Sequence, residues 1–127
     1  MADKIEIRLD GSLQVPDVPA FDFRTGLYTI PMWFNQVHPA VRGDLFTYKA
    51  SGNDYGIHMA SQGANTVSVY HNSFIGTAGS VVNGQWHFLV VTREAGGRTT
   101  AWLNGAVLFS GTDGASMSIA MDLLIGS

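Results

Sequence analysis

The 127-residue sequence predicts a single domain, residues 1–127, folded as an all-β antiparallel β-sandwich. Charged residues make up only 13% of the chain, whereas helical domains usually carry abundant Glu and Lys side chains. Short alternating or apolar segments recur along the chain, and clusters of Gly, Ser, Asn and Asp separate them. No segment shows the period of roughly 3.6 residues that an amphipathic helix requires. Such segments bury their apolar faces by packing two sheets together.

The first half of the chain contains predicted strands over residues 4–9, 13–15, 27–34, 45–49, 55–60 and 66–70. The first strand alternates, with Ile5, Ile7 and Leu9 on one face, and an Asp-Gly-Ser turn ends it. In the strand 27–34, Trp33 points to the opposite face from its apolar neighbours. Pro31 lies in the middle of that strand and has no N–H to donate, so an edge position or a bulge is predicted there.

The second half begins with a predicted loop, 71–83, followed by strands over residues 86–93, 99–103, 107–109 and 119–125. The segment 86–93 is the strongest strand in the chain. Its predicted register buries Trp86, with Phe88 and Val90 on the same face. Asn104-Gly105 predicts a two-residue hairpin of type I′, because both residues tolerate a positive φ.

Composition excludes several classes of protein. The net charge of −3 and the scattered basic residues give no electrostatic basis for binding nucleic acid or an anionic membrane. The chain has no cysteine, which excludes disulfides and thiolate metal sites. No segment is long and apolar enough to span a bilayer, and the N-terminus has no signal-peptide pattern. Synthesis in the cytoplasm is therefore favoured over secretion, and a location in a virion is compatible with it.

No catalytic arrangement is found, so the sequence predicts a protein that is not an enzyme. A retaining glycanase needs two carboxyl groups about 5 Å apart, but the only glutamates, Glu6 and Glu94, lie on different predicted strands. The four histidines lack the spacing of metal ligands. A Gly-x-Ser-x-Gly nucleophile elbow is also missing.

Several segments resemble laminin-G-like, concanavalin-A-like domains. The central one runs Gly84-Gln85-Trp86-His87-Phe88-Leu89-Val90-Val91-Thr92-Arg93 and continues, after a turn, as Thr100-Ala101-Trp102-Leu103-Asn104-Gly105. Segments 9–12, 28–34 and 123–126 are similar to further parts of the family pattern, in the same order. The resemblance implies a concanavalin-A-like jelly roll that recognises carbohydrate or a glycan-bearing surface without catalysis. It also implies core positions for Trp33 and Trp86.

The resemblance includes a departure at the C-terminus. The family continues past Ile-Gly into a closing strand, whereas this sequence stops at Ser127. The first strand would then present an open edge, which predicts a homo-oligomer or a partner chain. The interface candidates are Ile5, Ile7, Leu9, Leu123 and Ile125. A structural assembly subunit, such as a phage fibre, decoration or tail component, and a mobile-gene fragment therefore remain as alternative functions.

Two groups of residues are candidate ligand sites. The resemblance implies a rim Ca²⁺ site, for which Asp54 matches the first ligand position and Asp113 is the nearest candidate for the second, although both are also ordinary turn formers; no cofactor is required. Trp102 alternates with Ala101 and Leu103, so it faces the surface if those two face the core. An exposed Trp102 would stack on a sugar or join an interface, with lateral packing as the alternative. Tyr48, Tyr55 and Tyr70 could line the same sheet.

Overall fold

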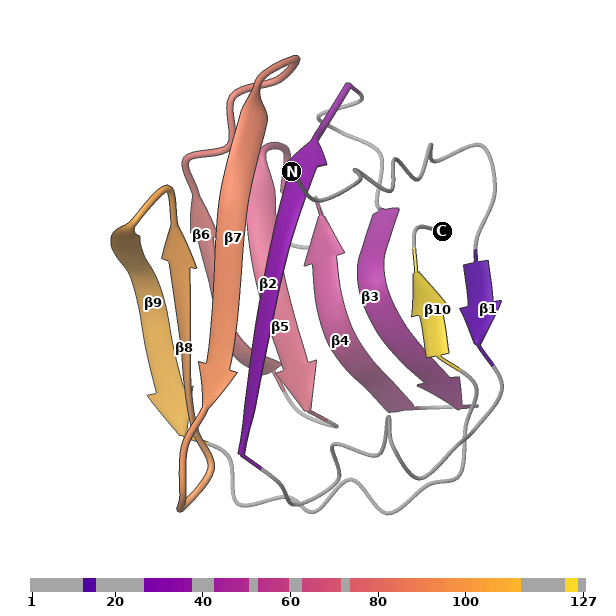
Figure 1. The fold of residues 1–127 in the computed structure, drawn as a ribbon, viewed down its shortest axis with the longest axis vertical. Coiled ribbons are helices and arrows are strands. Elements are labelled where there is room, and N and C mark those ends of the chain that lie inside the picture. The colour runs from indigo at the N-terminus through magenta and orange to yellow at the C-terminus, as the bar shows by residue number, and fades with distance from the viewer. Residues whose placement is uncertain are drawn as a thin grey trace, which may run out of the picture.

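The computed structural model describes residues 13–15, 27–37, 43–50, 53–59, 63–71, 74–112 and 123–125. One sheet contains β1 (Leu13–Val15), β10 (Leu123–Ile125), β3 (Gly43–Ala50), β4 (Asn53–Met59), β5 (Thr66–His71) and β6 (Phe74–Gly79), in that spatial order. The other contains β2 (Tyr28–Asn35), β7 (Trp86–Arg93), β8 (Arg98–Leu103) and β9 (Ala106–Thr112). The two sheets stack as a sandwich (Figure 1). This confirms the predicted all-β antiparallel architecture.

The described residues form no helix, and so none that could cross a membrane. Every strand pair is antiparallel, and most of the predicted strands are found within a few residues of their expected bounds. The hairpin at Asn104-Gly105 is also confirmed. Asn104 has φ 51° and Gly105 has φ 86°, and two positive φ values are the mark of a type I′ turn.

The predicted loop 71–83 is wrong, because it contains strand β6. A Cβ atom added at Gly76 would lie 2.4 Å from the Phe109 ring, and one added at Gly111 would lie 2.6 Å from the Ile75 carbonyl oxygen. The two glycines therefore let β6 and β9 approach closely at one side of the sandwich. Glycine is uncommon inside strands and common in loops, so a strand that needs glycine for close packing is easily taken for a loop in the sequence.

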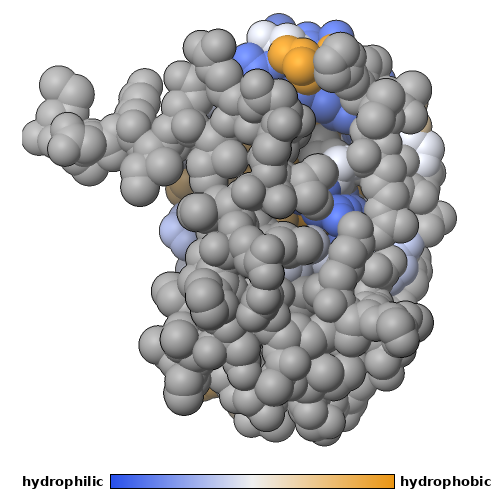
Figure 2. Space-filling view, turned by 90° about the vertical axis from the view of Figure 1, so that its right-hand side faces the viewer, coloured by the Kyte–Doolittle hydropathy of each residue, from blue (hydrophilic) through white to orange (hydrophobic). Residues whose placement is uncertain are grey.

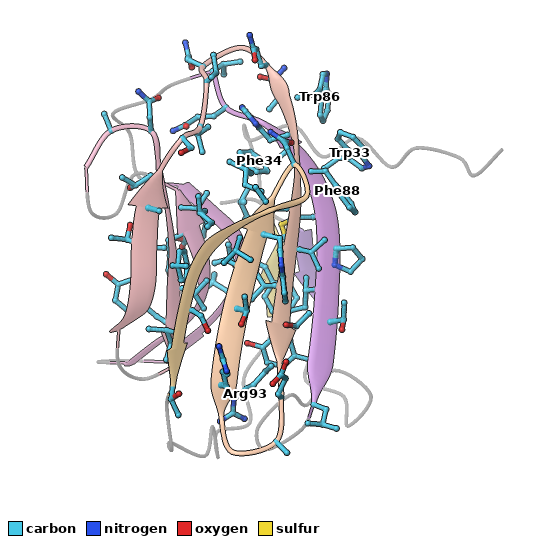
Figure 3. The ribbon with its side chains drawn as sticks, turned by 90° about the vertical axis from the view of Figure 1, so that its left-hand side faces the viewer. Trp33, Phe34, Trp86, Phe88 and Arg93 are labelled. Carbon is cyan, nitrogen blue, oxygen red and sulfur yellow. The ribbon has the colours of Figure 1, made fainter. Side chains whose placement is uncertain are left out.

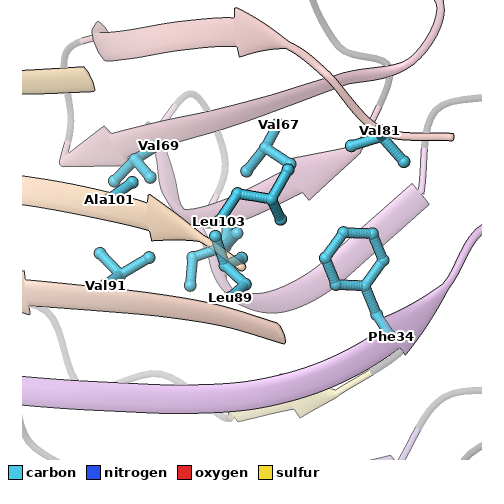
Figure 4. Packing of buried hydrophobic residues seen from close by; sticks show 9 residues of the cluster. Phe34, Val67, Val69, Val81, Leu89, Val91, Ala101 and Leu103 are labelled. Atoms are coloured by element: carbon cyan, nitrogen blue, oxygen red, sulfur yellow. The ribbon is translucent and has the colours of Figure 1, made fainter. Parts of the chain in front are cut away.

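The core lies between the sheets and consists of aliphatic side chains with one phenyl ring (Figure 4). Its buried members are Phe34, Ile57, Val67, Val69, Val81, Leu89, Val91, Ala101 and Leu103. Each fully buried large apolar side chain contributes about 1.5–3 kcal/mol relative to an exposed one. Apart from Val81, which lies between β6 and β7, strands from both sheets supply these residues, so this burial joins the two sheets.

Strand β2 ends its sheet, which confirms the edge position predicted from Pro31. Within the described residues β2 pairs with β7 alone, and Pro31 lies opposite Val90. A residue without an N–H is tolerated there because, in the described part of the chain, one side of β2 pairs with no other strand.

The C-terminal strand is not an open edge, which corrects the expectation that Leu123 and Ile125 serve as edge contacts. β10 pairs with β1 on one side and with β3 on the other. Leu123 lies opposite Val15 and Tyr48, and Ile125 lies opposite Leu13 and Phe46. Ladder bonds on both sides leave no backbone groups for an added strand. The other interface candidates, Ile5, Ile7 and Leu9, lie outside the described residues.

A polar pair is buried on the face of the six-stranded sheet that points away from the core. Asp44 and His58 lie opposite each other on β3 and β4, and the carboxylate Oδ1 is 2.5 Å from the imidazole Nδ1. Both side chains are buried. The ring of Tyr70 meets His58 edge-on, with 5.2 Å between centroids. Nothing in the sequence spacing predicted this pair.

Candidate functional site

The outer face of the four-stranded sheet exposes aromatic side chains from neighbouring strands. Trp33 on β2 lies opposite Phe88 on β7, and Trp86 lies two residue pairs further along, opposite Asn35. Trp33 is 66% exposed and Trp86 57% exposed. Figure 3 shows Trp33, Trp86 and Phe88 projecting together from the same side of the sheet, away from the core. Monomeric proteins seldom leave two adjacent indoles in water without a binding role.

Trp102 adds a third indole to this face. Ala101 and Leu103 are buried in the core, so the alternation of β8 places Trp102 on the outside, where it is half-buried. It lies opposite Val90 on β7 and Val107 on β9. Val107 is 64% exposed. All three tryptophans of the chain are therefore on one surface. We call the outward side chains Trp33, Trp86, Phe88, Val90, Trp102 and Val107 the aromatic face.

The rings of the aromatic face are held by contacts with their neighbours. The centroids of Trp33 and Phe88 are 5.0 Å apart and their planes are tilted by 35°, within the range of favourable aromatic pairs. The Phe88 backbone N–H donates to Asn104 Oδ1 at 2.9 Å, and the Asn104 N–H donates to the Phe88 carbonyl oxygen at 2.8 Å. The hairpin turn thus fixes the strand position from which Phe88 projects.

His87 anchors the same turn from the inside of the sheet. It is buried and its ring stacks on Phe34, with 5.5 Å between centroids. Asn104 Nδ2 donates to Nδ1 at 3.0 Å. Nε2 lies 3.0 Å from the Val82 backbone nitrogen and 3.2 Å from the Val82 carbonyl oxygen. His87 is therefore a positioning residue and does not line the aromatic face.

The loop before β7 is tied to the end of β2, which sets Trp86 beside the strand of Trp33. The Gly84 N–H donates to the Gln36 carbonyl oxygen at 2.7 Å, and Asn35 Nδ2 donates to the Gly84 carbonyl oxygen at 3.4 Å. This rim also exposes Val37 and Val82. Seen from the side of β1 and β10, hydrophilic residues gather at one end of the molecule beside a small hydrophobic surface (Figure 2).

The predicted burial of Trp33 and Trp86 is wrong. Phe88 and Val90 do share a face with Trp86, as predicted, but it is the outer face. Leu89 and Val91 point inward and are fully buried. Strand 86–93 is apolar on both faces, and the inward set also contains His87 and Arg93, so polarity did not distinguish the two faces. For Trp33 a signal existed, because alternation placed it opposite the buried Phe34.

The tyrosines predicted to line a sheet with Trp102 belong to the other sheet. Tyr48, Tyr55 and Tyr70 lie on β3, β4 and β5 of the six-stranded sheet. Tyr48 is opposite Tyr55, whereas Tyr70 is opposite Gly56. The structure therefore does not bring the three tyrosines together with Trp102.

The candidate calcium ligands are described only in part. Asp54 lies near the start of β4, opposite Lys49, and Asp113 lies outside the described residues. Within the described part of the chain, no group of three or more His, Cys, Asp or Glu side chains could hold a metal ion. The calcium site stays a prediction.

A Ca²⁺ ion shared by Asp54 and Asp113 would bind the folded state and not the unfolded state. Its binding would therefore raise the free energy of unfolding. Millimolar Ca²⁺ should then raise the Tm measured by calorimetry, and a chelator should reverse the shift. Asp54→Ala should abolish the shift, with Asp17→Ala as a control. An unchanged Tm in the wild-type protein would leave both residues with turn-forming roles.

Comparison with known proteins places this architecture in a family. A family model for laminin-G domains, described as the concanavalin A-like lectin/glucanases superfamily, matches residues 9–127. The chain belongs to this superfamily. The resemblance inferred from the segments around Trp86 and Asn104 is thereby confirmed, and so is the jelly-roll fold. No curated protein matches the sequence.

Three solved structures show the same superfamily fold at low sequence identity. Domain 4 of the extracellular GH43 arabinanase AbnA of Geobacillus stearothermophilus, in complex with arabinotriose, matches with TM-score 0.70 at 14% identity over 91% of this chain and 57% of that one. Mouse laminin alpha1 domains LG4-5 match with TM-score 0.68 at 17% identity, over 91% and 31%. The carbohydrate binding module CBM66 of Bacillus subtilis matches with TM-score 0.52 at 15% identity, over 79% and 66%. The chain thus spans less than two thirds of each of these structures.

Proposed function

We propose that the chain is a non-catalytic carbohydrate-binding module and that the aromatic face is its binding surface. The observation that supports this most directly is the position of all three tryptophans on one exposed sheet face. A sugar ring has an apolar face of C–H groups, which can cover an indole and remove apolar surface from water. Its hydroxyl groups remain at the edge of the ring, where polar side chains and water can reach them.

The composition of the surroundings also suits a sugar. Ligand sites typically combine aromatic side chains with a few polar groups that set the orientation of the ligand. Asn35 lies beside Trp86, and Thr29 and Thr92 lie further along β2 and β7 on the same outer face. Two of the similar structures support the class of ligand, since one is in complex with arabinotriose and the other is named a carbohydrate binding module.

A binding role without catalysis agrees with the acidic residues of the chain. Glu94 precedes the turn after β7, and the strands of the four-stranded sheet contain no Asp or Glu. The aromatic face therefore offers no pair of carboxyl groups for an acid and a nucleophile. The similar structures give no support to a phage assembly role. A homo-oligomer or partner chain through residues 4–9 stays a prediction.

Trp33→Ala and Trp86→Ala test the proposed site. Each should lower the affinity for a bound polysaccharide by about tenfold or more, equivalent to about 1.4 kcal/mol, because each removes a stacking surface. Affinity gel electrophoresis against a polysaccharide panel gives the ligand, and titration calorimetry gives Kd. Bound ligand should also shift the tryptophan emission to shorter wavelength, since every tryptophan of the chain is on this face.

Leu27→Ala is the matched control. Leu27 is 71% exposed but lies just before β2, roughly 20 Å from Trp33 at the strand rise of about 3.3 Å per residue. Its replacement should leave Kd unchanged. If the two tryptophan variants bind as tightly as the Leu27 variant does, the aromatic face is not the binding surface.

A further inference from the structure

The aromatic face is almost free of charge. The strands of the four-stranded sheet contain no Asp, Glu or Lys, and their only arginines are Arg93 and Arg98. Arg93 is buried on the inner face. Arg98 is exposed, but it lies opposite Thr112 at the far end of β8 and its Nε donates to Ser110 Oγ at 3.2 Å. Every other polar side chain that points outward from these strands is an amide or a hydroxyl.

This charge distribution selects among classes of glycan. Sulfate and carboxylate groups are recognised by clustered Arg and Lys side chains, with charge-assisted hydrogen bonds. A cationic sugar would need Asp or Glu in the same way. One arginine at the far end of β8 supplies neither arrangement, whereas apolar rings surrounded by Asn, Thr and Ser match an uncharged, hydroxyl-rich ligand.

The aromatic face is also longer than one sugar ring. Trp86 and Trp102 lie on adjacent strands, and Trp102 is opposite Val90, four residues along β7 from Trp86. At about 3.4 Å per residue and 4.8 Å between strands, the two positions are roughly 14 Å apart along a diagonal. Phe88 and Val90 lie along β7 between these two positions, and Trp33 lies beside Phe88 on β2, so the rings span three adjacent strands. A chain of linked sugars can therefore contact several of these rings at once.

Resting on the proposed carbohydrate-binding function, we infer that the aromatic face binds an uncharged, extended polysaccharide chain that crosses β2, β7 and β8 diagonally. Neutral polymers and their anionic counterparts distinguish this inference from the function itself. Suitable neutral probes are hydroxyethylcellulose and linear arabinan, and suitable anionic probes are heparin and polygalacturonate. Oligosaccharides of increasing length from the bound polymer test the extended contact.

The expected result is retardation by a neutral polymer, with Kd changing less than about twofold between roughly 0.05 M and 0.5 M NaCl, because salt screens charges and leaves apolar contacts intact. Affinity should rise by about tenfold or more between a disaccharide and a longer oligosaccharide. Trp102→Ala should reduce the affinity for the long oligosaccharide while changing that for the disaccharide much less. Arg98→Ala should leave Kd unchanged.

Three results would overturn the inference. Binding to heparin or polygalacturonate that is lost at high salt or in Arg98→Ala would leave the carbohydrate-binding function standing and exclude an uncharged ligand. Equal affinity for short and long oligosaccharides would exclude the extended contact. No binding to any polymer, together with a dimer in sedimentation equilibrium that Trp33→Ala dissociates, would overturn the proposed function as well and assign the aromatic face to a second copy of the chain.

Discussion

Asp44→Ala is expected to destabilise the fold by about 1–3 kcal/mol, the usual cost of leaving a buried polar group without its hydrogen-bond partner. The carboxylate faces His58 Nδ1 at 2.5 Å and both side chains are buried. The variant keeps the imidazole in the same buried place but removes the acceptor in front of its Nδ1. Urea unfolding followed by circular dichroism measures the change in the free energy of unfolding.

Asp44→Asn is the matched control for this prediction. It keeps an oxygen opposite Nδ1 and nearly the same volume, so it should cost less than the alanine variant. In a double-mutant cycle with His58→Ala, the coupling energy should reach about 1–3 kcal/mol, because the two groups are in direct contact. A cost below about 1 kcal/mol for Asp44→Ala, within the range of ordinary surface changes, would show that the pair does not hold β3 to β4.

The elements with strong local signals were predictable from the sequence. Asn104-Gly105 predicted a type I′ hairpin because of its backbone preferences, and Pro31 predicted an edge position or a bulge because it lacks a donor. Strand β6 was not predictable in the same way. Gly76 is needed for contact with Phe109 on a strand of the other sheet, and that need is visible only once the two sheets are stacked.

The candidate site shows the same limit. The sequence grouped Trp86 with Phe88 and Val90 on one face of a strand. It also placed Trp33 and Phe34 on different faces of their strand, so the side chains that share a face were predictable. Which face meets the core was not, because both faces of β7 are largely apolar. The inward face of β7 is the one whose residues Leu89 and Val91 pair with the buried Leu103 and Ala101 of β8. The Asp44–His58 pair was missed because only strand pairing brings together residues 14 positions apart.

The register of β7 leads to a second large effect, in a pair of variants on the same strand. Leu89 is fully buried and lies opposite Met32 and Leu103. Leu89→Ala should cost about 2–5 kcal/mol, because it removes buried apolar surface and leaves a cavity between well-packed neighbours. Trp86→Ala removes a larger side chain but should cost about 1 kcal/mol or less, as expected for an exposed position.

Chemical denaturation of both variants measures the two costs under one set of conditions. Leu89→Met is the control, since it nearly conserves volume and should cost less than about 1.5 kcal/mol. The order of the two alanine variants distinguishes the two possible registers of the strand, because a shift by one residue exchanges its faces. If Trp86→Ala proved the more destabilising, Trp86 would belong to the core, and it could not contribute to the aromatic face. With the expected order, Trp86 can be changed with little effect on folding, so a loss of polysaccharide binding in Trp86→Ala reports on contact with the ligand.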